Sequence, residues 1–161
     1  MRIGIVSDTH GHVGFARLAV EVLKTEQVEC VLHCGDIGSV EIVPLFEAWP
    51  THFVFGNVDR DEDRLRREIA AAGQTCHGRF GELEWDGVKI ALLHSDDADR
   101  FHEAMFSGEY DLVCYGHTHQ ADQRQIGRTL VLNPGALYRA TPHSLAVVEL
   151  PSLDVRIIPV G

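Results

Sequence analysis

The feature that most constrains the fold of this chain is a repeated pairing of a short apolar run with a segment of helical periodicity. The first run, RIGIVS, leads into Val13–Thr25, whose apolar residues recur at steps of three and four, as on an amphipathic helix. A fifth run, DLVCY, follows the last such pair and indicates one more buried strand. The other three runs, CVLHC, THFVF and VKIALL, precede expected helices over Val40–Trp49, Asp61–Ala72 and Ala98–Phe106.

The remaining segments have the pattern of antiparallel hairpins. FGELEWDGVKIALL alternates apolar and polar residues around the dipeptide Asp86-Gly87, which favours a two-residue turn. DQRQIGRTLVLN and SLAVVELPSLDVRIIPV also read as hairpins. We therefore expect residues 1–161 to form a single α/β domain in which sheets pack together with helices outside.

The charge of the chain narrows the kinds of partner it can bind. It has 24 acidic and 14 basic side chains, a formal net charge of -10 at pH 7. This charge disfavours a broad nucleic-acid surface or an anionic membrane as partner, because both require clustered Lys and Arg.

No apolar stretch approaches the ~18 residues of a membrane span, and MRIGIVSD resembles a strand more than a signal peptide. A cytoplasmic enzyme or binding protein fits these features.

Residue types that bind metals follow five of the expected strands. Because the carboxyl ends of neighbouring parallel strands meet at one rim of a sheet, we expect these side chains to converge. Each has a simpler explanation when taken singly, as a helix cap, a turn dipeptide or a surface histidine. Adjacent glycines, Gly11, Gly35, Gly56 and Gly116, are expected to adopt the backbone angles that aim these side chains over the strand ends. The set is Asp8 and His10 in SDTHG, Asp36 in CGDIG, Asn57 in GNVD, His94 in LLHSD, and His117 with His119 in GHTH.

The ordered set D-x-H, GD, GN, H and GHTH resembles the calcineurin-like metallophosphoesterase superfamily. The short length, GNVD, and NPGA at Asn133–Ala136 make the chain similar to the small bacterial and archaeal phosphodiesterase branch. The resemblance implies a four-layer fold in which two mixed β-sheets pack as a sandwich with flanking helices. It covers nearly the whole chain.

The resemblance also implies two divalent metal ions and hydrolysis of a phosphodiester bond by a hydroxide that bridges them. Manganese is the ion we expect to support activity in vitro, and iron, zinc, cobalt or nickel would suit the same nitrogen and oxygen ligands. The residues expected to act in catalysis are Asp8, Asp36, Asn57 and His94. The implied ligands are Asp8, His10, Asp36 and His119 for one ion, and Asp36, Asn57, His94 and His117 for the other, with Asp36 bridging.

The sequence departs from the superfamily pattern at two positions. Many members have a histidine directly after the Asn of the GN motif, where it assists the leaving group, and this chain has Val58. Its absence favours activated leaving groups or another acid, for which His12 and Asp59 are the candidates. Relatives commonly have glycine after the histidine that corresponds to His94, whereas this chain has Ser95.

Two alternatives to a phosphodiesterase of small phosphodiester or nucleotide-like substrates stay open. One is a non-catalytic scaffold, as in the retromer subunit that shares this fold. Scaffold members typically have substitutions among the metal positions, and the presence of all seven here favours catalysis. The other is a phosphomonoesterase or nucleotidase with the same metal centre. Members of the family often dimerise, so a homodimer is compatible with the resemblance.

Overall fold

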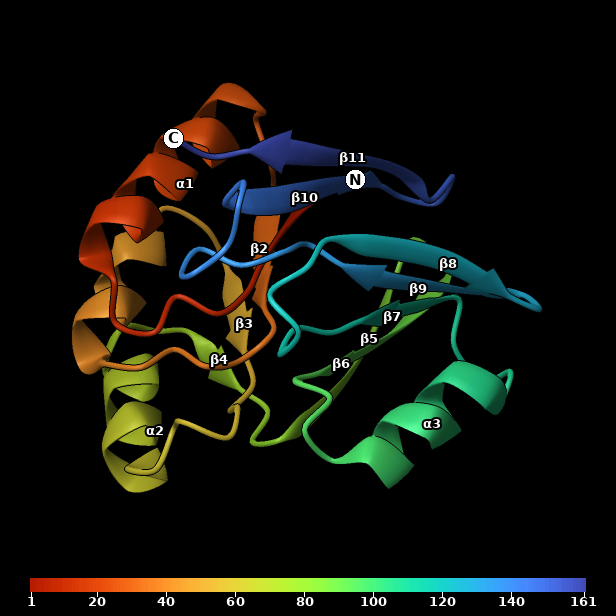
Figure 1. Ribbon diagram of the computed structural model, residues 1–161, viewed down its shortest axis with the longest axis horizontal. Helices are drawn as coiled ribbons and strands as arrows, with labels where there is room; N and C mark the ends of the chain where they lie inside the picture. The colour runs from red at the N-terminus through yellow and green to blue at the C-terminus, as the bar shows by residue number, and fades with distance from the viewer.

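The computed structural model describes residues 1–161, which form two β-sheets with helices on their outer faces (Figure 1). In chain order the elements are β1 (Arg2–Val6), α1 (Val13–Thr25), β2 (Cys30–His33), η1 (Val40–Phe46), β3 (Thr51–Phe53), α2 (Glu62–Ala71), β4 (Thr75–Cys76), β5 (Phe80–Trp85), β6 (Val88–Leu93), α3 (Ala98–Phe106), β7 (Leu112–Cys114), β8 (Asp122–Ile126), β9 (Thr129–Asn133), β10 (Ser144–Glu149) and β11 (Asp154–Pro159).

Both sheets are mixed. The first has six strands in the order β11-β10-β1-β2-β3-β4, and the second has five in the order β5-β6-β7-β9-β8. Strands β1 to β4 pair in parallel, as do β6, β7 and β9. The hairpins β5-β6, β8-β9 and β10-β11 are antiparallel and lie at the sheet edges, and β10 also pairs antiparallel with β1. The expected turn at Asp86-Gly87 joins β5 to β6, and both of its residues have positive φ, at 50° and 76°. The predicted sandwich of two mixed sheets is confirmed.

Three apolar cores hold four layers together. The first core packs α1, η1 and α2 on the outer face of the six-stranded sheet, with Leu23 and Phe53 among its members. The second fills the space between the two sheets and contains Ile5 and Leu92. The third packs α3 on the outer face of the five-stranded sheet through Met105. None of the helices combines the length and the apolar composition that crossing a membrane would require.

The segment expected to be a helix over Val40–Trp49 is instead a 3-10 helix that ends at Phe46. Pro44 lies inside it, and its missing N–H and its ring are incompatible with the hydrogen-bond pattern of an α-helix interior. The prediction of an α-helix over this whole range was therefore wrong in type and in length.

The next helix, α2, has the boundaries that its sequence indicates. Asp61 lies just outside the helix and its side chain accepts a hydrogen bond from the N–H of Arg64. At the other end Gly73 has φ 71°, its N–H donates to Ala70, and the following N–H donates to Ile69. This is a Schellman termination, which requires a left-handed residue after the helix.

Strand β4 was not expected. It consists of two residues, too few to show any periodicity, and it exists because the chain leaving α2 pairs in parallel with β3. The strand is thus a product of tertiary pairing.

Candidate metal centre

The loops that follow β1, β2, β6 and β7 bring six acidic and histidine side chains together in two groups. Within each group, one potential ligand atom of every residue lies within 4.8 Å of the others. Each group takes residues from both sheets, so the site forms only when the sandwich is assembled. The groups are Asp8, His10 and His119, and Asp36, His94 and His117.

The two carboxylates lie at the centre of the site, with imidazoles facing them. The Oδ2 atom of Asp36 lies 3.2 Å from Nε2 of His10 and 3.0 Å from Nε2 of His94. The Oδ1 atom of Asp8 lies 3.2 Å from Nε2 of His119. Asp36 therefore contacts residues of both groups, which is the placement that a bridging ligand needs.

Main-chain and side-chain donors fix both carboxylates. Asp8 accepts hydrogen bonds from the hydroxyl of Ser7 at 2.6 Å and from the N–H of His117 at 3.0 Å. Asp36 accepts one from the N–H of Val58 at 3.0 Å. These donors occupy some of the acceptor positions and leave others directed at the histidines.

The ionisation of the site depends on positive charge near the carboxylates. Burial by itself would raise the pKa of Asp8 and of Asp36, but His10 and His94 outweigh it and lower both pKa values. Burial opposes the charge on His10 as well, yet the hydrogen bonds to Asp36 and Asp8 raise the pKa of His10 to about 9. Burial also opposes the charge on His94, but the nearby carboxylates of Asp36 and Asp8 raise its pKa. A divalent cation would supply the positive charge that these carboxylates require.

His94 shows that the residues fit a metal ion. Its Nδ1 donates to the carbonyl of Cys34 at 2.8 Å, so in the neutral ring the lone pair is on Nε2. This Nε2 is completely buried and lies 3.0 Å from Oδ2 of Asp36, but it makes no well-aligned hydrogen bond, a state that is rare for a buried polar atom. A backbone carbonyl that holds one ring nitrogen while the other faces the site is typical of a histidine that binds metal.

The backbone is strained at most of the site residues. Left-handed φ angles are unusual for residues other than glycine, and each costs of order 1 kcal/mol or more. Such a cluster persists only where the surrounding structure determines it, and it is characteristic of functional sites. The site residues with this conformation are Asp8 (55°), His10 (45°), Asp36 (54°), His117 (75°) and His119 (62°).

The four glycines beside the site have two different roles. Gly11 and Gly35 have positive φ, at 74° and 95°, as expected. The expectation was wrong for Gly56 and Gly116, whose φ angles are not positive. Glycine is needed at these two positions because a side chain would collide with neighbouring atoms. A Cβ on Gly56 would lie 2.6 Å from the backbone N of Asp36, and one on Gly116 would lie 2.7 Å from Oδ2 of Asp8.

Two side chains hold the GHTH loop by its first carbonyl. Nδ2 of Asn133 donates to the carbonyl of Gly116 at 3.1 Å and to the hydroxyl of Thr118 at 3.0 Å. Ser95 donates to the same carbonyl at 3.3 Å, and it has the glycine-like φ of 86°. The sequence predicted no catalytic role for the NPGA turn, which Asn133 begins. The Asn-Pro pair was its only signal, and that pair equally describes an ordinary turn.

The remaining predicted site residues lie around the two groups. Asn57 follows β3 in the same loop as Val58, with an exposed side chain that makes no hydrogen bond within the chain. His12 is exposed at the start of α1, and its ring centre lies 6.0 Å from that of Tyr138. His12 is not a member of the two groups of acidic and histidine side chains.

Asp59 is buried beneath the loops that hold the site. Its carboxylate accepts hydrogen bonds from the N–H groups of Ile37 at 3.1 Å, Gly38 at 2.9 Å and Gly56 at 2.9 Å. Burial raises its pKa against these bonds. All three bonds require the carboxylate as acceptor, so this geometry disfavours Asp59 as the acid of the leaving group and gives it a positioning role.

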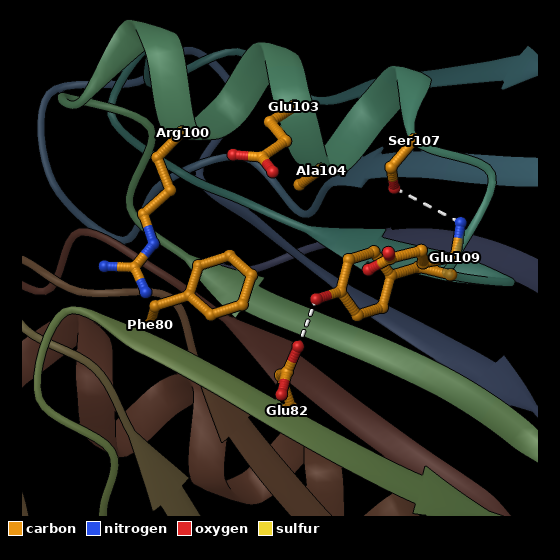
Figure 2. Close-up of a pocket in the computed structure, with 8 residues that line it drawn as sticks. Phe80, Glu82, Arg100, Glu103, Ala104, Ser107 and Glu109 are labelled. Carbon is orange, nitrogen blue, oxygen red and sulfur yellow. Dashed lines mark hydrogen bonds between the residues drawn. The ribbon is translucent and has the colours of Figure 1, made fainter.

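A cavity between α3 and β5 shares no residue with the two groups (Figure 2). It has a volume of about 390 Å³, and Figure 2 shows the Arg100 guanidinium beside the ring of Phe80, 4.3 Å from its centre. Three carboxylates, those of Glu82, Glu103 and Glu109, also line it. This excess of negative charge makes the cavity unsuitable for an anionic substrate, which leaves the two metal-binding groups as the candidate site.

Comparison with known proteins agrees with this geometry. The model of the calcineurin-like phosphoesterase superfamily domain matches residues 1–152. A phosphodiesterase of Methanocaldococcus jannaschii is 35% identical over 138 residues, which cover 84% of this chain and 83% of that protein. A solved structure described as a novel archaeal phosphodiesterase superposes with a TM-score of 0.91 at 31% identity, covering 99% of this chain and 100% of the other. Vps29 of Entamoeba histolytica, solved with Zn²⁺, has a TM-score of 0.64 at 18% identity, covering 98% of this chain and 90% of the other, which shows a shared fold alone.

Proposed function

Because the chain belongs to the calcineurin-like phosphoesterase superfamily and is a metal-dependent phosphoesterase, we propose that it hydrolyses phosphodiester bonds at a dinuclear metal centre. The observation that carries this proposal is the pair of adjacent ligand groups around Asp8 and Asp36. The buried Nε2 of His94 faces both carboxylates, at 3.9 Å and 3.0 Å, without a well-aligned hydrogen bond.

In the proposed centre, Asp36 would hold both ions, because its Oδ2 lies near His10 of one group and His94 of the other. Two divalent ions bound there would polarise the phosphoryl oxygens and lower the pKa of an attacking water. We take manganese as the ion for activity in vitro, with iron, zinc, cobalt and nickel as alternatives. The proposed ligands are Asp8, His10, Asp36 and His119 for the first ion, and Asp36, Asn57, His94 and His117 for the second.

The charges of the site suit an anionic diester. Asp8 and Asp36 contribute two negative charges, fewer than the four positive charges of two divalent ions, so the pocket keeps an excess of positive charge. Asn57 and His117 have exposed side chains at the mouth of the site, where a substrate phosphate would enter.

The leaving group has little help from the protein. Val58 occupies the position where many relatives have a histidine, and Asp59 is engaged by three backbone N–H groups. The proposed substrates therefore carry leaving groups that depart readily without protonation, or His12, which is exposed near the first group, protonates the leaving group.

The experiment removes metal from the purified protein and follows hydrolysis of bis(p-nitrophenyl) phosphate while manganese is titrated back. We expect turnover to return with metal and to fall at least about 100-fold in Asp36→Asn, because that change weakens the ligand shared by both ions. Asp63→Asn, an exposed carboxylate on α2, is the matched control and should retain activity.

The other outcomes separate the alternatives. Manganese binding without turnover of any ester would favour the scaffold. Faster hydrolysis of p-nitrophenyl phosphate than of the diester would favour a phosphomonoesterase. Failure to bind metal in calorimetry would refute the site itself.

A further inference from the structure

A second cavity lies directly beside the metal centre. It has a volume of about 570 Å³ and begins at Thr118 and His119, which belong to the GHTH loop. The segment that joins β9 to β10 and the residues Ile157 and Pro159 of β11 form its other walls. His119 is thus shared between the first metal-binding group and this cavity.

Arg139 lines this cavity and has an exposed side chain. Its carbonyl accepts a hydrogen bond from Nδ1 of His119 at 3.4 Å, and its backbone has the unusual φ of 46°. Its guanidinium lies 5.2 Å from the ring centre of Tyr138, and that ring stacks on His10 at 5.0 Å. Arg139 is therefore tied to two residues of the first group, one through its backbone and the other through its side chain.

The charge of Arg139 has no partner within the chain. Arg139 forms no ion pair with a carboxylate, unlike Arg124 on a neighbouring hairpin. Other arginines, such as Arg60, form none either, but Arg139 is the only arginine that lines this cavity. In a protein with a net charge of -10, an arginine beside a metal site that makes no ion pair is available to an anionic group of a ligand.

The size and lining of the cavity indicate what this ligand group is. Small-molecule sites span about 300–1,000 Å³, so the cavity exceeds what one phosphate would fill. Pro142, Ile157 and Pro159 provide apolar surface, and the hydroxyl of Thr141 provides a polar contact. This lining suits a sugar and base better than a bare anion.

Building on the proposed phosphodiesterase function, we propose that this cavity binds a nucleoside-sized substituent of the diester, and that Arg139 binds a second phosphate on that substituent. The substrate class is then a nucleotide diester with a further phosphate, as at the end of a short oligonucleotide, and Arg139 is a specificity residue.

The test compares two esters that share the reacting phosphorus and leaving group. These are thymidine 5′-(p-nitrophenyl phosphate) and its 3′-phosphorylated form, assayed with manganese by release of p-nitrophenol. We expect the wild-type protein to have a kcat/KM about tenfold higher for the 3′-phosphorylated ester, the size of one charge-assisted contact. Arg139→Met should abolish this preference, Arg139→Lys should restore part of it, and Arg128→Met, on the hairpin turn between β8 and β9, should keep it.

The outcomes distinguish this inference from the function on which it rests. Turnover of bis(p-nitrophenyl) phosphate without a preference for the 3′-phosphate refutes the inference and leaves the phosphodiesterase standing. A preference that persists in Arg139→Met also refutes it, because another group would then bind the phosphate. Absence of turnover on all three esters, with metal bound, refutes the proposed function.

Discussion

At the scale of single residues, His12 and Asp59 differ in what their surroundings allow. Asp59 is 2% exposed and accepts three hydrogen bonds from the loops after β2 and β3, so its charge holds those loops together. His12 is exposed and packs against Phe15, with ring centres 5.2 Å apart. A proton donor must reach the leaving group, and only His12 has a side chain free to do so.

Substitutions at these two positions should have different consequences. Asp59→Ala leaves three backbone donors without a partner, two of them buried, and should lower the free energy of unfolding by about 3 kcal/mol, measured by urea denaturation. His12→Ala should slow hydrolysis of a phenyl diester about tenfold more than that of the p-nitrophenyl diester, because the poorer leaving group depends more on an acid. Equal slowing of both esters would rule out His12 as the acid.

At the scale of elements, the loops after β2 and β3 approach each other more closely than any side chain on Gly56 would permit. The N–H of Val58 in one loop donates to Asp36 in the other, and Ile37 of that second loop donates back to Asp59 in the first. The backbone of Gly56 lies against Asp36. The position of Asp36 therefore depends on the absence of a Cβ in a neighbouring element.

Gly56→Ala should displace Asp36 and weaken manganese binding at least about tenfold, measured by calorimetry. Gly87→Ala is the comparison, because Gly87 has φ 76° with no atom within 4 Å of an added Cβ. It should cost about 1 kcal/mol of stability through backbone strain and leave metal affinity unchanged. Unchanged metal affinity in Gly56→Ala would show that the loops can move apart without loss of the site.

At the scale of the whole molecule, a histidine pair lies where the two sheets are connected. His52 of β3 and His77 after β4 share a hydrogen bond of 2.8 Å, and His52 packs against Trp85 of β5 with ring centres 5.2 Å apart. Burial, together with the neighbouring His77, lowers the pKa of His52 to about 4. Burial also lowers the pKa of His77. The pair is stable only when at least one ring is neutral.

This pair should make the protein less stable in mild acid. The folded-state pKa of His52 lies below the ordinary value of 6.5, so the unfolded chain takes up the proton first, and stability falls as pH decreases from about 6.5 to about 4. His52→Gln should reduce this loss by of order 1 kcal/mol, a value discounted because the pair is partly exposed to water. Urea midpoints between pH 7.5 and 4.5 measure it, with exposed His102→Gln as the control that should follow the wild type.

The sequence by itself determined what local patterns can encode. Apolar periodicity predicted ten of the eleven strands and the three α-helices, and Asp86-Gly87 predicted a hairpin turn. The residue types after the strands named the seven candidate ligands, because parallel strands present their carboxyl ends at one rim. The assignment of these ligands to two separate ions came from the resemblance to the metallophosphoesterase superfamily.

Only the tertiary structure decided how these residues meet. Strand β4, the left-handed backbone at Asp8 and Asp36, and the roles of Asn133 and Asp59 arise from hydrogen bonds and close contacts between loops that are distant in sequence. Such contacts leave no periodic signal, because each depends on where two independently formed elements are packed. The 3-10 helix is the exception. Pro44 is a local signal against an α-helix, but the helical periodicity of the neighbouring apolar residues led to the wrong prediction.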